Sequence, residues 1–100
     1  MTRLHIALQE GFSNDEVIIK VNGIEHAHRS AVMTKNQIGY ADSVDLELPT
    51  GEVQVEVSVP TRGLEQATVV HLNEPVYLGV SVERGGGLRY QHSSEPFGYL

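Results

Sequence analysis

The stretch EVIIKVNGIEHAHR (Glu16–Arg29) carries the strongest local fold signal in the chain, an Asn-Gly pair between two alternating apolar runs. Asn-Gly suits the two central positions of a type I′ turn because both positions need positive φ, and such a turn joins antiparallel strands. The stretch therefore predicts a β-hairpin that reverses at Asn22-Gly23.

A two-residue turn also fixes which residues face each other across the hairpin. Opposite charges facing each other across two strands stabilise a sheet by about 0.2–1 kcal/mol a pair, and the expected register creates two such pairs on one face. It gathers the two histidines and the branched residues of the first strand on the other face. The predicted facing pairs are Val21–Ile24, Lys20–Glu25, Ile19–His26, Ile18–Ala27, Val17–His28 and Glu16–Arg29.

His26 and His28 have the spacing of two ligands of one metal ion. Residues two apart on a strand point to the same side, about 6–7 Å apart, and a divalent transition metal needs at least one further donor. A histidine on a half-buried strand is also commonly a hydrogen-bonded structural residue, so both interpretations stay open. The sequence offers as further donors His5, His71, His92, Asp42 and Asp45.

Two glycines, Gly23 and Gly39, flank the histidine pair. With His26 and His28 they resemble the first motif of the cupins, which are β-barrel proteins that hold a metal with a His-x-His pair. This resemblance implies a small metal-dependent enzyme as an alternative function, with no catalytic residue assigned.

Alternation of apolar and polar residues recurs along the chain and is typical of half-buried strands. Turn-forming residues separate these runs at about the eight- to twelve-residue spacing of consecutive antiparallel strands. Only Ser30–Ile38 is ambiguous and could hold a short helical turn. We predict an all-β protein, a single antiparallel β-sandwich of seven or eight strands that spans residues 1–100. The clearest alternating runs are Arg3–Leu8, Val17–Val21, Val44–Leu48, Val53–Val59 and Val76–Val82.

Composition excludes several classes of function. The chain has no cysteine, which removes disulfide scaffolds and thiolate zinc sites. Its 13 acidic residues outnumber 7 scattered basic ones, giving a net charge of −6, so we expect no nucleic-acid partner. The opening MTRLHIALQEGF lacks the apolar core of a signal peptide, and no long apolar run is present, so a cytoplasmic location and no membrane partner are expected.

The middle of the chain has a second resemblance. Thr34 and Gly39 precede a strand that begins at Tyr40, and LPTGEVQVEV (Leu48–Val57) follows. Over roughly residues 34–57 this arrangement is similar to carboxypeptidase regulatory-like domains, which are transthyretin-type sandwiches. The resemblance implies a non-catalytic accessory or scaffolding role and assigns no functional residue.

The function predicted from the sequence is a non-catalytic module for protein binding or assembly. The run Val53–Val59 is long and has few breakers, and at a sheet edge it would offer unpaired backbone groups to a protein partner or to a second copy, giving a homodimer. Carbohydrate or small-ligand binding is a further alternative. Its surface would comprise Tyr77, Tyr90, Phe97 and Tyr99.

Overall fold

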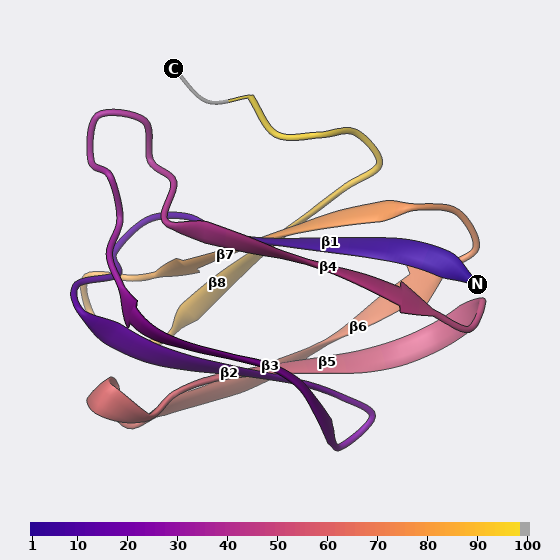
Figure 1. Ribbon diagram of the computed structural model, residues 1–100, viewed down its shortest axis with the longest axis horizontal. Helices are drawn as coiled ribbons and strands as arrows, with labels where there is room; N and C mark the ends of the chain where they lie inside the picture. Colours follow the sequence, from indigo (N-terminus) through magenta and orange to yellow (C-terminus); the bar gives the residue numbers. More distant parts are fainter. Residues whose placement is uncertain (99–100) are drawn as a thin grey trace.

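The computed structural model describes residues 1–98, which form two four-stranded sheets packed face to face (Figure 1). The two layers and eight strands confirm the predicted all-β sandwich in outline. Within the described residues no helix is long and apolar enough to cross a bilayer. Sheet A has the order β4-β1-β7-β8, and sheet B has the order β3-β2-β5-β6. The elements are β1 (Thr2–Leu8), β2 (Asp15–Val21), β3 (Ile24–Val32), β4 (Asp42–Leu48), β5 (Gly51–Val59), the 3₁₀ turn η1 (Pro60–Arg62), β6 (Leu64–Leu72), β7 (Val76–Val82) and β8 (Leu88–Ser93).

Sheet A is mixed, so the prediction of a purely antiparallel sandwich is wrong for this layer. β1 pairs antiparallel with β4 but parallel with β7, where Leu4 faces Val76 and Ile6 faces Leu78. Strands β2 to β6 lie between β1 and β7 in the chain, so no hairpin joins β1 to β7 and none fixes their direction. Alternation within a strand carries no information about the direction of a neighbour that lies far away in the sequence.

The core lies between the sheets and consists of branched aliphatic side chains from both inner faces. The alternation read from the sequence places these side chains correctly, because residues at every second position share a face. The ambiguous segment Ser30–Ile38 continues β3 to Val32 and then makes a turn closed by the bridge between Lys35 and Tyr40. The largest fully buried side chains include Leu4, Ile6, Leu8, Ile19, Leu72 and Leu78.

The hairpin of β2 and β3 forms as predicted next to its turn, but the predicted register fails beyond it. Val21 faces Ile24 and Lys20 faces Glu25, whereas Ile19 faces Ala27 because a β-bulge at His26 inserts an extra residue. The bulge puts the small Ala27 into the core, where the residue is 8% exposed.

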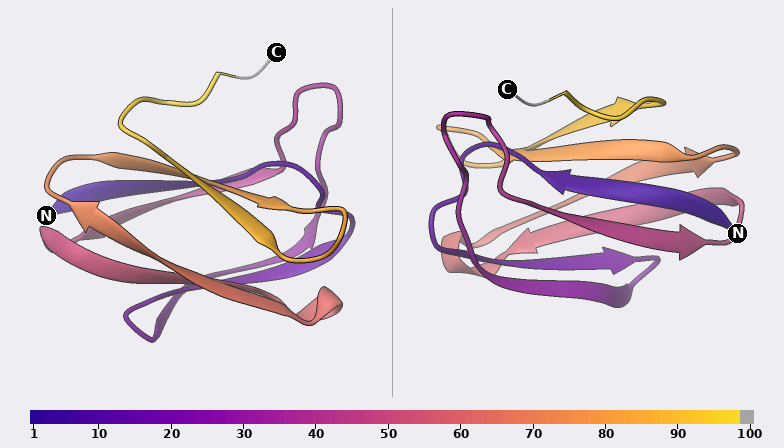
Figure 2. Two further views of the ribbon diagram at one scale, coloured as in Figure 1. Left: turned by 180° about the vertical axis from the view of Figure 1, so that it is seen from behind. Right: turned by 45° about the horizontal axis from the view of Figure 1, so that its top comes forward.

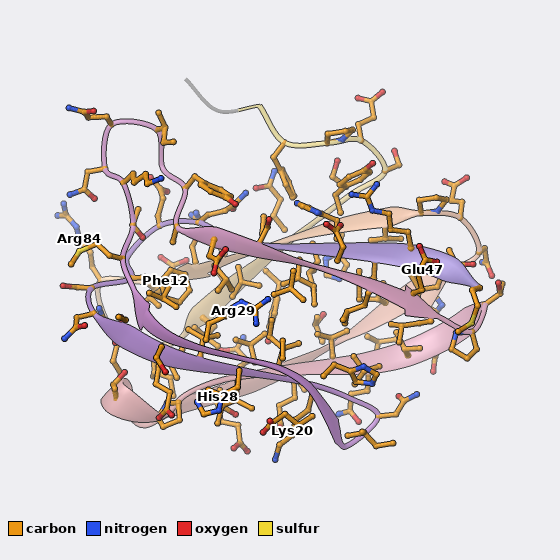
Figure 3. The ribbon with its side chains drawn as sticks, in the orientation of Figure 1. Phe12, Lys20, His28, Arg29, Glu47 and Arg84 are labelled. Carbon is orange, nitrogen blue, oxygen red and sulfur yellow. The ribbon has the colours of Figure 1, made fainter. Side chains whose placement is uncertain are left out.

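The bulge also changes the expected ion pairs. Val17 faces Arg29, so the predicted Glu16–Arg29 pair does not form. Instead Glu16 contacts His28, and the guanidinium of Arg29 reaches Asp42 of β4 at 3.5 Å, across the open side of the sandwich (Figure 3).

β5 lies inside sheet B, between β2 and β6. The condition for partner binding by Val53–Val59, a position at a sheet edge, is therefore not met. Its inward residues are almost fully buried and its backbone is paired on both sides, which explains why this run is the most regular in the sequence.

A buried carboxylate ties the β1–β2 loop to the turn after β5. Asp15 accepts hydrogen bonds from the Ser13 N–H at 2.8 Å, from the Thr61 hydroxyl at 2.7 Å and from the Arg62 Nε at 3.0 Å. Arg62 also donates to the Gly11 carbonyl at 2.8 Å. Burial raises the pKa of Asp15, but the hydrogen bonds from Arg62, Ser13 and Thr61 outweigh it and hold the pKa below its ordinary value.

The β1–β2 loop packs tightly against the end of β7. The Val82 N–H donates to the Glu10 carbonyl at 2.8 Å, and Gly11 has a φ of 87°. Next to it, Phe12 inserts its ring into the core, and its N–H donates to the hydroxyl of buried Thr34 at 3.0 Å (Figure 3). The loop is thus held by the core on one side and by backbone bonds on the other.

Candidate functional site

The two sheets have four edge strands within the described residues, β3, β4, β6 and β8, and β6 is the longest regular one. β6 spans nine residues, and each of them faces a residue of β5 without a break in register. The view from behind shows β6 along the near side of the molecule, below β8 (Figure 2, left). An edge strand of this kind presents unpaired N–H and C=O groups.

Backbone alternation shows which residues of β6 face the open edge. The Asn22 N–H donates to the Gln54 carbonyl at 2.9 Å and the Asn22 side chain accepts from the Gln54 N–H at 2.9 Å, so the backbone of Gln54 faces β2. Neighbouring residues direct their backbone groups to opposite sides, so Val55 faces β6 and its partner Thr68 faces β5. The residues that face away from β5, called here the β6 edge residues, are Glu65, Ala67, Val69 and His71.

The β6 edge residues are exposed in both side chain and backbone. All four side chains lie on the outer face of sheet B, and Val69 is 48% exposed although it is apolar. Within residues 1–98 no protein group forms a hydrogen bond with their backbone. β6 also contains no lysine and no proline, the residues that most often protect an edge.

The other three edges are protected. β3 has two register breaks and a positive φ of 55° at Ala31. β4 carries three carboxylates, Asp42, Asp45 and Glu47, and β8 is only six residues long. Bulges, charges and short length are the usual means of preventing strand addition, so β6 is the edge best suited to it.

Tyr90 of β8 supports β6 from the inner side. It faces Val80, which is fully buried, so its ring lies on the core face of sheet A. Its hydroxyl donates to the Gln66 carbonyl and accepts from the Val57 N–H at 3.3 Å, which joins β8 to both β5 and β6. Burial, with a smaller contribution from the charge of Glu56, raises the pKa of Tyr90 to about 12, against the lowering effect of the Val57 N–H.

Tyr90→Phe is expected to lower the free energy of unfolding by about 1–2 kcal/mol because it removes the hydrogen bonds of the hydroxyl to the Gln66 carbonyl and the Val57 N–H. The raised pKa means that Tyr90 stabilises the fold fully below pH 10 and that this contribution is lost as the pH rises towards 12. The stability gap between the wild type and Tyr90→Phe should therefore narrow over that range. Urea unfolding followed by circular dichroism measures the gap, with Tyr77→Phe as the control. A gap that stays constant from pH 10 to 12 would contradict the role of the hydroxyl.

The aromatic residues expected to form a ligand surface do not come together. Tyr77 lies on the outer face of sheet A, where its ring centre is 5.6 Å from that of His5, whereas Tyr90 lies on the inner face. Phe97 is half-buried in the segment after β8. Tyr99 lies outside the described residues.

His26 and His28 both lie on the exposed side of β3, not on the apolar face that the sequence predicted. The bulge at His26 shifts the register, so His28 faces Ile18 and its Nε2 is 2.5 Å from the Glu16 carboxylate. Figure 3 shows His28 and Lys20 pointing away from the interior. Within the described residues no group of three or more His, Asp or Glu side chains could hold a metal ion.

Two of the further donors considered in the sequence do meet, but on the other sheet. His5 Nδ1 lies 2.7 Å from Asp45 Oδ1 on the outer face of sheet A, and Arg3 donates to the same oxygen at 2.8 Å. The hydrogen bonds from His5 and Arg3 hold the pKa of Asp45 below its ordinary value. This cluster pairs its charges internally and joins β1 to β4.

Among the cavities formed by residues 1–98, two lie at opposite ends of the sandwich. One, of about 360 Å³, includes Val70, His71 and His92 and adjoins the end of β6. The other, of about 430 Å³, includes Glu10, Glu83 and Arg89 near the β1–β2 loop. Neither of these two cavities is lined by Tyr77, Tyr90 or Phe97.

Sequence reasoning missed β6 as the long unprotected edge. LEQATVVHL (Leu64–Leu72) alternates less cleanly than Val53–Val59, because an edge strand with a solvated outer face needs fewer apolar residues. The absence of lysine and proline could not have singled it out, because every strand except β2 lacks both residues.

Comparison with protein-family models, with curated proteins and with solved structures finds no match to this chain. The fold and the β6 edge together describe a small β-sandwich with one unprotected strand.

Proposed function

We propose that this protein is a non-catalytic binding module that recognises a protein partner by strand addition at β6. The observation that carries this proposal is the unbroken row of free backbone groups at Glu65, Ala67, Val69 and His71, on the one long edge without protection. In strand addition the main-chain hydrogen bonds supply affinity, and alternate side chains supply specificity.

The test uses random peptides displayed on phage and selected on the immobilised protein. Selected peptides should be rich in β-branched residues and should shift the NMR amide signals of Ala67 and Val69. Peptides that bind only at another surface, or a failure to select any, would contradict the proposal.

A matched pair of substitutions at Ala67 isolates the backbone contribution. Ala67→Pro removes an N–H that faces the open edge. The substitution therefore breaks no hydrogen bond between β5 and β6, and proline is tolerated at such a position. Ala67→Thr keeps the N–H. Peptide binding should weaken at least about tenfold in Ala67→Pro, because a hydrogen bond is lost and the ring blocks the edge, and it should be retained in Ala67→Thr. Equal binding by the two variants would contradict strand addition.

A further inference from the structure

The β6 edge residues can pair with themselves when a second copy approaches antiparallel. A two-fold axis through Thr68 sets Glu65 of one copy against His71 of the other, and Ala67 against Val69. This gives four hydrogen-bonded pairs with two bonds each, about eight backbone bonds in all. Every free edge group of both strands is used, and the two copies of sheet B become one continuous sheet.

Side chains in this register are complementary. Glu65 lies opposite His71 twice, so an acidic side chain meets a basic or neutral one at both ends of the interface, while Ala67 and Val69 form apolar pairs between them. Facing pairs of opposite charge stabilise antiparallel strands, and like charges destabilise them. At the centre Thr68 faces its own copy, and threonine pairs are also favourable across strands.

Other self-pairings are less favourable. Moving the axis from Thr68 to Ala67 or to Val69 leaves one edge residue of each copy without a partner and separates Glu65 from His71. A second copy at the β4 edge would add its own Asp42, Asp45 and Glu47 to the three carboxylates already on that strand. The register centred on Thr68 therefore has the most hydrogen bonds and no like-charge pair.

The hydrogen bonds between β8 and β6 do not involve the β6 edge residues. The contacts of β8 with β6 come from the inner side, where Thr68 Oγ1 lies 3.4 Å from His92 Nε2 and the Leu88 N–H donates to the Gln66 side chain at 3.2 Å. These contacts join β6 to β8 on the inner side of sheet B and leave the backbone groups of the β6 edge residues unbonded.

We propose that the partner at β6 is a second copy of this chain, forming a two-fold dimer centred on Thr68. This inference rests on the proposed function and names its partner. The acidic surface does not oppose it, because the only carboxylate among the β6 edge residues faces a histidine.

Light scattering after size exclusion tests the dimer directly. The wild type should have twice the 11.0 kDa mass of the chain, and Ala67→Pro should raise the dimer dissociation constant at least about tenfold while Ala67→Thr leaves it unchanged. Amide signals that stay dispersed in Ala67→Pro show that the variant is folded. A wild type that is monomeric at NMR concentrations, or an undiminished dimer in folded Ala67→Pro, would overturn the proposal.

Charge reversal tests the register. Glu65→Lys places a cation opposite His71 and should weaken the dimer, and the double variant Glu65→Lys/His71→Glu should restore it. Because His71 also lies 3.7 Å from Glu52 of its own chain, His71→Glu alone is the control for repulsion within the chain. A double variant no tighter than either single variant would exclude this register. A monomer that still binds selected peptides at β6 would refute self-pairing and leave the proposed function standing.

Discussion

Arg62→Ala is expected to lower the free energy of unfolding by about 3 kcal/mol, because it leaves a buried carboxylate without its cation. The side chain of Asp15 is 3% exposed and that of Arg62 is 34% exposed, so the carboxylate lies out of solvent beneath the guanidinium. The substitution also removes the hydrogen bond that Arg62 donates to the Gly11 carbonyl. Urea unfolding at neutral pH measures the loss.

The pH dependence identifies the cause. In the wild type the lowered pKa of Asp15 stabilises the fold above its ordinary value of 3.8, and this contribution is lost as the pH falls further. Without Arg62, burial favours the protonated form of Asp15. Low pH therefore removes the unpaired buried charge that destabilises the variant. The difference between wild type and Arg62→Ala should shrink below pH 3.8. Arg84→Ala, in the exposed β7–β8 turn, is the control and should be nearly neutral (Figure 3). A difference that is the same at neutral and acid pH would rule out this account.

Gly11→Ala is expected to destabilise the protein by about 3 kcal/mol, through positive φ and a backbone clash together. A Cβ at this position would lie 2.2 Å from the Val82 carbonyl oxygen and 2.9 Å from the Val82 Cβ. Neither neighbour can move without disturbing β7. The β1–β2 loop would have to shift instead, which would weaken the hydrogen bond from the Val82 N–H to the Glu10 carbonyl and displace the buried ring of Phe12.

Two further glycines separate the contributions. Gly63 has a φ of 64°, but a Cβ added there would meet no atom within 4 Å, so Gly63→Ala tests backbone strain alone and should cost about 1 kcal/mol. Gly85 has neither feature, so Gly85→Ala should be nearly neutral. Thermal unfolding of the three variants should rank Gly11, Gly63 and Gly85 in order of decreasing loss. A Gly11→Ala variant no less stable than Gly63→Ala would show that the β1–β2 loop can move to accommodate the added Cβ, and would contradict this prediction.

The sequence predicted the strands well and their arrangement poorly, for a physical reason. Alternation along Val53–Val59 reports which side chains are buried, since that depends on neighbours within the strand. The position of the same run inside sheet B depends on β2 and β6, which alternation does not encode. The hairpin shows the limit at shorter range. Asn22-Gly23 fixed the first two facing pairs, and the bulge at His26 then moved both histidines to the exposed side. The same rules therefore located the core but not the candidate docking edge.

The parallel pairing of β1 with β7 has a consequence for how the chain acquires its structure. β1 is the first strand to be synthesised, yet it lies in the middle of sheet A and meets one neighbour only after β7 has been made. Contacts between such distant segments form only after a long loop has closed, so the entropy of loop closure is lost before the contacts contribute any free energy. This slows folding compared with helical proteins of similar length. During synthesis the β1 backbone groups that pair with β7 have no partner until β7 has been made. We therefore expect the native state to appear late and in one cooperative step.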